Sequence, residues 1–153
     1  MTNNDVLRSL RYILNVPDSK LAEILKLADC TVSLQDVSSF LKKDDEAGFK
    51  GCPDQVLAQF LNGLVTYRRG PRTNEDSRPP PDEPMTNNVV LKKLRVAFEL
   101  KDDDIVAIIE KSGIKIVKTE LSAFFRKPDH RNYRDCGDQF LRNFLKGLTV
   151  KPI

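Results

Sequence analysis

Histidine occurs once and cysteine three times among the 153 residues, and both scarcities limit the chemistry open to this protein. Three cysteines, a small and odd number, do not make a disulfide framework, so we expect a reducing, cytoplasmic environment. His130 has no partner at a metal-ligand spacing, and we therefore predict no metal site and no cofactor. Because no histidine accompanies Cys52 or Cys136, a thiol hydrolase would lack its general base.

Long apolar runs and glycine-rich phosphate loops are missing as well. No stretch approaches the roughly 20 apolar residues that cross a bilayer, and MTNNDVLRSL lacks the basic start of a secretory signal. We find no Walker-type loop, no dinucleotide-binding glycine loop and no nucleophile elbow. The composition, 40% hydrophobic and 31% charged, is that of a soluble globular protein away from membranes.

An internal repeat dominates what is present. Residues 1–67 and 85–151 align without a gap at a constant offset of 84, so that CPDQVLAQFLNGL matches CGDQFLRNFLKGL. Residues 68–84 hold five prolines and no large apolar residue, which is typical of an extended linker. We therefore predict a helical repeat over 1–67, a flexible Pro-rich linker over 68–84 and a second helical repeat over 85–153, with a pseudo-twofold relation between the repeats.

Each copy is predicted to form four helices, and the fold is predicted to be all-α because no segment shows a competing strand pattern. Asn3 or Asn4 is expected to cap the first helix, Asp18 to start the second, Ser33 to cap the third and Pro53 to open the fourth. Apolar residues at helical spacing mark the inward faces of the first copy: Leu7, Leu10, Leu14, Leu21, Ile24, Leu25, Ala28, Leu34, Val37, Phe40, Leu41, Leu57, Phe60, Leu61 and Leu64.

Gly63 and Gly147 occupy matched positions inside the fourth helix of each copy. A glycine inside a helix costs about 1 kcal/mol, so its retention needs a reason. We expect a close approach between helices at this point, either within one copy or between the two copies.

Matched polar residues are the candidates for a functional site: Arg11, Cys52, Asp54, Gln55, Arg95, Cys136, Asp138 and Gln139. Amides at a helix start can acidify a preceding thiol, but we favour the interpretation that each cysteine is a small buried residue. An arginine–aspartate pair between Arg11 and Asp54 is expected to tie the first helix to the fourth. The alternative is a polar site where the copies join.

Charge is spread unevenly between the copies. Residues 1–67 carry seven basic and nine acidic residues, whereas residues 85–153 carry 14 and nine. A candidate basic patch of the second copy consists of Arg126, Lys127, Arg131, Arg134, Arg142 and Lys146. With Phe124, Phe125 and Tyr133 nearby, this patch could contact a phosphate backbone, although drift of solvated faces after duplication also explains it.

Several motifs together resemble a known family. They are NNDVLRSLRYIL, FLKKDDEAGF, CPDQVLAQFLNGL, NNVVLKKLRVAFEL and PDHRNYRDCGDQFLRNFLKGL, and they cover nearly the whole chain except the linker. The chain is similar to the YehS-like family of small bacterial proteins, a domain-of-unknown-function family. The resemblance implies a duplicated helical protein of the bacterial cytoplasm, and it implies no activity, cofactor or catalytic residue.

The leading functional hypothesis is a non-enzymatic binding or regulatory module. Its partner would be another protein or a second copy of the chain, docked in a groove between the repeats or on the basic side of the second repeat. We rank two alternatives lower. One is a nucleic-acid-binding regulator that uses the basic patch, and the other is a small-molecule binder or enzyme at the repeat interface.

Overall fold

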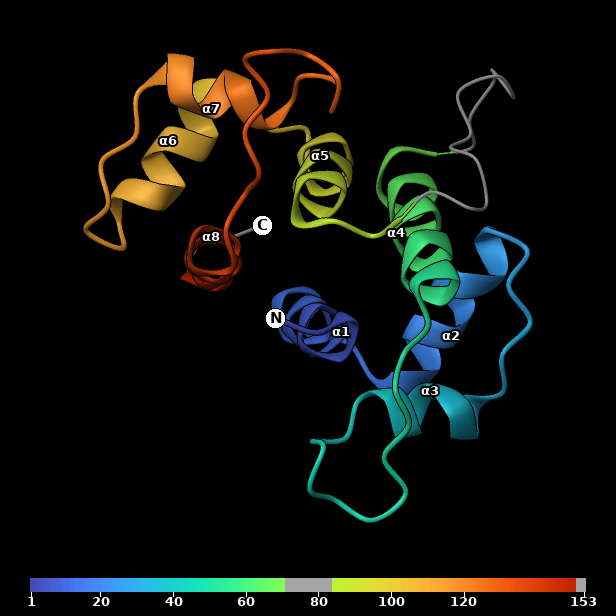
Figure 1. The fold of residues 1–153 in the computed structure, drawn as a ribbon. Coiled ribbons are helices and arrows are strands. Elements are labelled where there is room, and N and C mark those ends of the chain that lie inside the picture. The colour runs from blue at the N-terminus through green and yellow to red at the C-terminus, as the bar shows by residue number, and fades with distance from the viewer. Residues whose placement is uncertain (71–83, 151–153) are drawn as a thin grey trace. The chain divides into compact units, whose positions relative to one another are not determined.

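The computed structural model describes residues 1–70 and 84–150, which form two helical units that divide near residue 85 (Figure 1). Every regular element in these ranges is a helix, so the predicted all-α fold with four helices in each repeat is confirmed. The first unit contains α1 (Asn3–Leu14), α2 (Asp18–Leu27), α3 (Leu34–Phe40) and α4 (Asp54–Arg69). The second contains α5 (Asn87–Ala97), α6 (Asp102–Glu110), α7 (Lys118–Phe124) and α8 (Asp138–Val150).

The end of the first repeat differs from the expected boundary. Helix α4 continues to Arg69, so the first two residues of the expected linker are helical. Gly70 follows with a φ of 88°, a backbone conformation that favours glycine at a helix end. Residues 71–83 of the expected linker lie outside the described residues.

Threonine, rather than asparagine, caps the first helix of each repeat. The Thr2 hydroxyl accepts a hydrogen bond from the amide of Asp5 at 3.1 Å, and the Asp5 carboxylate accepts one from the Thr2 amide at 2.9 Å. Thr86 caps α5 through the amide of Val89 at 3.2 Å. The expectation that Asn3 or Asn4, or their counterparts in the second repeat, would act as caps is therefore wrong.

The two units bury the same positions, which explains why the repeat retains them. Leu10, Leu57 and Phe60 are fully buried in the first unit, and their counterparts Leu94, Leu141 and Phe144 are fully buried in the second. Among the expected inward positions, Leu14 and Ala28 are half-buried, and Leu34 is the most exposed at 51%. It lines a cavity of about 370 Å³ between α2 and the start of α3.

Gly63 and Gly147 mark a close helix approach inside each repeat. A Cβ on Gly63 would overlap the carbonyl oxygen of Ile24 on α2 and lie 3.0 Å from its carbonyl carbon. A Cβ on Gly147 would overlap the Ile108 side chain on α6 and lie 3.0 Å from the Ile108 carbonyl oxygen. The expected close approach is therefore confirmed, and it fixes how α4 packs on α2 and α8 on α6.

Candidate functional site

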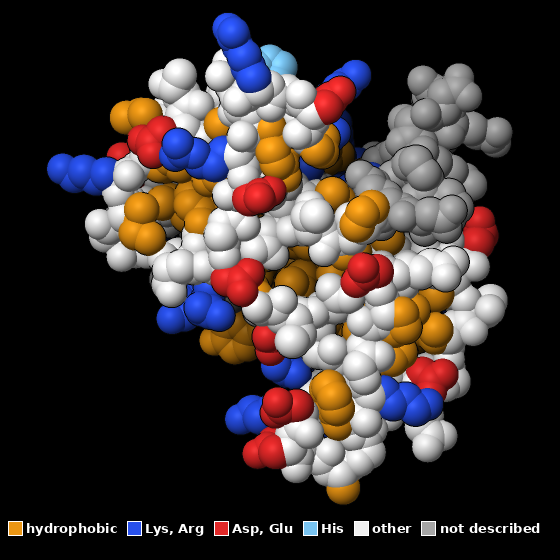
Figure 2. Space-filling model, in the orientation of Figure 1, with side chains coloured by type: hydrophobic (Ala, Val, Ile, Leu, Met, Phe, Trp, Pro, Cys, Tyr) orange, Lys and Arg blue, Asp and Glu red, His pale blue; other side chains and the backbone are white. Residues whose placement is uncertain are grey.

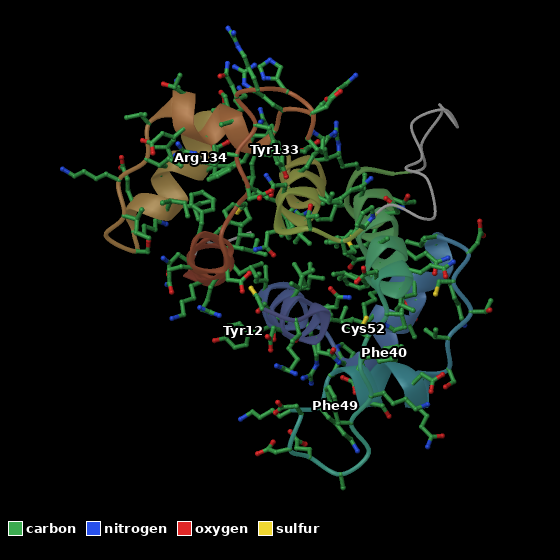
Figure 3. The ribbon with its side chains drawn as sticks, in the orientation of Figure 1. Tyr12, Phe40, Phe49, Cys52, Tyr133 and Arg134 are labelled. Atoms are coloured by element: carbon green, nitrogen blue, oxygen red, sulfur yellow. The ribbon has the colours of Figure 1, made fainter. Side chains whose placement is uncertain are left out.

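Asn4 joins three separate backbone segments of the first repeat. Its buried side chain donates to the carbonyl oxygens of Phe40 at 2.9 Å and Lys50 at 2.8 Å. Its Oδ1 atom accepts from the amide of Cys52 at 3.0 Å. Phe40 and Cys52, which flank the loop between α3 and α4, are labelled in Figure 3. One asparagine thus satisfies both ends of that loop, and we call this arrangement the asparagine clamp.

The second repeat contains the same clamp atom for atom. Asn88 donates to the carbonyl oxygens of Phe124 at 3.0 Å and Arg134 at 2.9 Å, and it accepts from the amide of Cys136 at 2.9 Å. Buried backbone groups must be paired, and a primary amide has both donors and acceptors to pair them. The retained asparagines therefore have a structural explanation that our assignment of capping missed. The signal was a run of three polar residues, Thr-Asn-Asn, kept in both copies where a cap needs only one.

Asp54 and Asp138 belong to a neighbouring contact. Asn3 Nδ2 donates to Asp54 Oδ1 at 2.7 Å and to the carbonyl oxygen of Cys52 at 3.0 Å. Asn87 makes the same two contacts with Asp138 and Cys136, at 2.7 and 2.9 Å. The expected pair between Arg11 and Asp54 is therefore replaced by an asparagine–aspartate contact.

Arg11 instead pairs with Asp18, the first residue of α2, at 3.1 Å between Nε and Oδ1. Arg95 pairs likewise with Asp102 at 3.0 Å, and its guanidinium lies 4.6 Å from the centre of the Phe125 ring. Each arginine thus links the first helix of its repeat to the second, across the short connection between them. These pairs are partly exposed, and such pairs stabilise a fold by less than about 1 kcal/mol.

The two matched cysteines are not suited to react as thiolates. Cys52 and Cys136 are buried, and all three cysteines, which lie in the described ranges, are free thiols. Burial, followed by the nearby Asp54 carboxylate, raises the pKa of Cys52 to about 12. Burial and then Asp138 raise the pKa of Cys136 to about 12. These effects outweigh the helix start, which would lower a thiol pKa.

The remaining matched residues do not converge on a pocket. Gln55 is exposed at the start of α4. Gln139 donates to Asn143 on its own helix at 3.2 Å. Within the described residues, no group of three or more histidine, cysteine or acidic side chains could hold a metal ion. The shared arginines and aspartates therefore each make a contact inside their own repeat, whereas Gln55 is exposed.

The loop that precedes the fourth helix is where the repeats differ in charge. We call residues 126–134 the basic loop; it holds four basic residues and one acidic residue, whereas residues 42–50 of the first repeat hold three of each. Both loops make the same backbone turns. Tyr133 N donates to His130 O at 2.9 Å, as Phe49 N donates to Glu46 O at 3.3 Å. The two loops therefore share these backbone turns but differ in their net charge.

The arginines and lysine of the basic loop are exposed. Figure 2 shows Lys and Arg side chains standing out from the surface around the only histidine. The Arg126 Nη1 atom lies 3.5 Å from the ring Nε2 of His130. The structure thus presents the cationic groups of this loop to solvent.

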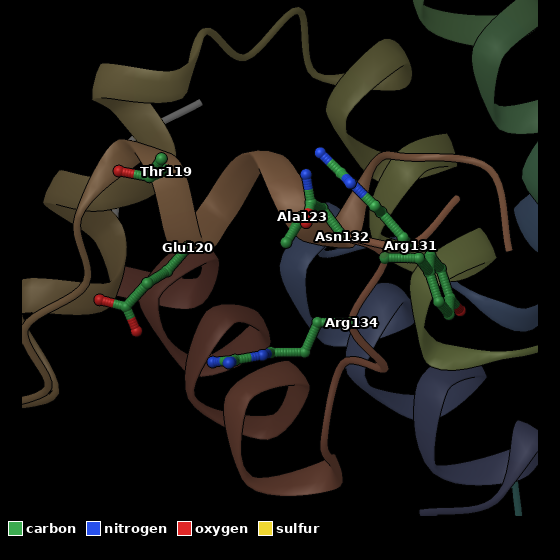
Figure 4. A pocket seen from close by; sticks show the side chains of 7 residues that line it. Thr119, Glu120, Ala123, Arg131, Asn132 and Arg134 are labelled. Carbon is green, nitrogen blue, oxygen red and sulfur yellow. The ribbon is translucent and has the colours of Figure 1, made fainter. Parts of the chain in front are cut away.

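A pocket of about 320 Å³ opens between α7 and the basic loop, and we call it the α7 pocket (Figure 4). It is lined by Thr119, Glu120, Ala123, Arg131, Asn132, Tyr133 and Arg134. Burial raises the pKa of Tyr133, and a hydrogen bond to the Asp135 side chain raises it further. In Figure 4 the Arg134 side chain extends toward the Glu120 side of the pocket.

Two of the six residues in the expected basic patch, Arg131 and Arg134, line this pocket. Arg126 and Lys127 lie at the start of the basic loop, outside the pocket lining. Arg142 and Lys146 are exposed on α8, where Arg142 donates to Gln139 at 3.4 Å. The six residues of the expected basic patch therefore divide among the pocket lining, the start of the basic loop and the exposed face of α8.

Comparison with known proteins agrees with this duplicated architecture. The model of a family described as "Protein of unknown function (DUF1456)" matches residues 3–70 and 87–152. This chain belongs to the DUF1456 family. The two matched segments correspond to the two helical units, so one family unit is one four-helix repeat.

The chain is also similar to a protein of Escherichia coli (strain K12) named "Uncharacterized protein YehS". It is 46% identical over 153 residues, which cover 99% of this chain and 96% of the relative. The predicted YehS-like membership is therefore confirmed. No solved structure matches the chain. Among the described residues, no helix is long and apolar enough to cross a membrane.

Proposed function

We propose that this chain is a non-enzymatic binding module that recognises an acidic protein partner through the basic loop of its second repeat. One observation carries the proposal: the shared asparagines, arginines and aspartates make contacts inside each repeat, whereas the basic loop is exposed and has no equally basic counterpart in the first repeat. A surface that differs between two copies of one fold is free to serve binding, because the fold does not depend on it.

A protein partner is favoured over nucleic acid by the carboxylates near the arginines. Glu120 lines the α7 pocket together with Arg131 and Arg134, and Asp129 and Asp135 lie within or beside the basic loop. A continuous positively charged surface favours binding along a phosphate backbone. Mixed charge with a basic excess instead suits a protein surface of complementary pattern, where opposite charges speed encounter and like charges reject wrong partners.

Affinity capture from a bacterial lysate tests this proposal, with and without nuclease and with mass-spectrometric readout. We compare the wild-type chain with Arg131→Glu and with Ala47→Glu, which places the same residue at the matched, exposed loop position of the first repeat. We expect one protein partner whose recovery falls several-fold with Arg131→Glu and is unchanged by Ala47→Glu or nuclease.

Other results would contradict the proposal in distinct ways. Recovery that nuclease abolishes would assign the basic loop to nucleic acid. Equal loss with Arg131→Glu and Ala47→Glu would show that the basic loop has no special role. An eluate without a partner would leave a small-molecule ligand as the better hypothesis.

A further inference from the structure

The α7 pocket has a counterpart in the first repeat that is bridged by an ion pair. Lys50 and Asp36 occupy the positions matched to Arg134 and Glu120, and Lys50 Nζ lies 2.7 Å from Asp36 Oδ1. The same contact draws the pKa of Asp36 below its ordinary value, because the Lys50 ammonium donates a hydrogen bond to the carboxylate. Cation and anion of the first repeat therefore satisfy each other across this site.

In the second repeat the matched cation and anion are not joined in this way. Glu120 and Arg134 both line the α7 pocket, and among the described residues no ion pair connects them. The Arg134 backbone is held firmly, since its amide donates to Ala123 O at 3.2 Å and its carbonyl accepts from the asparagine clamp. The guanidinium is thus presented from a fixed backbone with its hydrogen-bonding capacity open to a ligand.

The lining of the pocket identifies the chemistry of that ligand. Because two arginines and one glutamate line the pocket, its net positive charge attracts an anion. A planar guanidinium pairs with a carboxylate through two parallel hydrogen bonds. Asn132 and the half-buried Tyr133 add a polar group and an aromatic wall. A volume of about 320 Å³ lies at the small end of ligand sites, which suits one side chain rather than a large cofactor.

We infer that the α7 pocket receives the carboxylate side chain of an acidic peptide segment, with Arg134 as its main partner and Arg131 at the rim. The inference rests on the proposed function and names the group that the acidic partner inserts. Glu120 weakens the binding of every anion by repulsion. Only segments that approach Arg134 closely therefore gain enough attraction to bind.

Titration of the full-length, ¹⁵N-labelled protein with acetylated hexaglutamate tests the inference by NMR. The backbone amides of Asn132 and Tyr133 report on the α7 pocket, and those of Gly48 and Phe49 report on the matched site of the first repeat in the same spectrum. We expect saturable shifts at Asn132 and Tyr133 that exceed those at Gly48 and Phe49. Acetylated hexaglutamine, which has the same length and no charge, is expected to produce none.

Three variants assign the roles of the charged groups. Arg134→Ala should weaken hexaglutamate binding about fivefold, the upper range for one exposed ion pair, while its backbone contacts remain. Lys50→Ala, the matched change in the first repeat, should leave the affinity unchanged. Glu120→Gln should tighten binding severalfold because it removes the repelling carboxylate. Weaker or equal binding with Glu120→Gln, or equal effects of Arg134→Ala and Lys50→Ala, would overturn the inference.

Inorganic phosphate provides the second probe. If it shifts Asn132 and Tyr133 as strongly as hexaglutamate at equal concentration, the site is a general anion site and the carboxylate assignment is wrong. The outcome also separates this inference from the proposed function. Suppose that Arg131→Glu abolishes partner capture but hexaglutamate does not bind at the α7 pocket. That result would support the binding module and contradict this inference alone.

Discussion

Individual polar residues in this protein mainly join segments of their own repeat. The asparagine clamp, the contacts of Asn3 with Asp54, and the pairs of Arg11 and Arg95 all join segments of one repeat. A polar side chain that is retained in two copies can look like a functional residue in the sequence. Here its retention follows from the cost of leaving buried amides and carbonyls without partners.

The buried thiols lead to a prediction about pH. The pKa of Cys52 and of Cys136 is about 12 in the folded protein, against an ordinary value of 9.0. Above pH 9 the unfolded chain releases these protons first, so the free energy of unfolding falls as pH rises from 9 to 12. The slope approaches about 1.4 kcal/mol per pH unit for each thiol.

Urea denaturation at a series of pH values checks this expectation. The Cys52→Ala/Cys136→Ala variant should lose the thiol contribution, so its unfolding free energy should fall less steeply above pH 9 than that of the wild type. Lost packing in the variant lowers stability equally at every pH and does not alter the slope. Identical slopes for the two proteins would show that the thiols ionise alike in the folded and unfolded states.

At the scale of helices, a glycine on the fourth helix of each repeat sets the distance to the second helix. The backbone of α4 approaches that of α2 so closely at Gly63 that no Cβ fits. The close approach requires glycine at this position, although alanine is the better helix former by about 1 kcal/mol. Packing between two helices thus outweighs intrinsic propensity at this position.

Gly63→Ala is expected to lower the free energy of unfolding by about 2 kcal/mol or more, because the new methyl group meets the Ile24 carbonyl rather than a movable side chain. Gly147→Ala should cost less, since its nearest neighbour is the Ile108 side chain. Chemical denaturation measures both.

Gly51→Ala is the control, because nothing lies within 4 Å of its Cβ, and it should change stability by less than about 0.5 kcal/mol. A Gly63→Ala variant as stable as Gly51→Ala would contradict the close approach.

At the scale of the whole molecule, the chain consists of two compact units, each with a core and an asparagine clamp of its own. We therefore expect a change in one clamp to destabilise the repeat that contains it. Asn4→Ala leaves two carbonyls and one amide without their partner, and each buried unpaired group costs about 1–3 kcal/mol. The expected loss of stability in the first repeat is about 3 kcal/mol.

Native-state hydrogen exchange reads the two repeats separately. With Asn4→Ala, amides of the first repeat should lose protection and those of the second should keep it, and Asn88→Ala should give the reverse pattern. Asn3→Ala serves as a milder control within the same helix, with an expected loss of about 1 kcal/mol from its more exposed contacts. Equal loss of protection in both repeats with Asn4→Ala would show that they unfold as one unit.

The sequence predicted the helices well because the repeated leucine and phenylalanine positions directly encode buried faces. It also predicted the close approach at Gly63, because the cost of a glycine inside a helix can be recognised from the local sequence. It failed for Arg11, where Asp18 and Asp54 were equally matched acids at helix starts. Only the packing of the helices decides which carboxylate lies within reach of the guanidinium. It failed for Asn4 because a cap and a contact with a distant backbone group use the same side-chain chemistry.

The amino-acid sequence by itself determined the duplication, the all-helical fold and the basic character of the second repeat, since periodicity, repetition and charge are properties of the chain order. Tertiary structure decided which polar residues meet, how deeply Cys52 and Cys136 are buried, and that Lys50 pairs with Asp36 while Arg134 and Glu120 line an open pocket. These outcomes depend on distances between segments far apart in the chain. Such distances are set by how the cores pack, and no local pattern contains them.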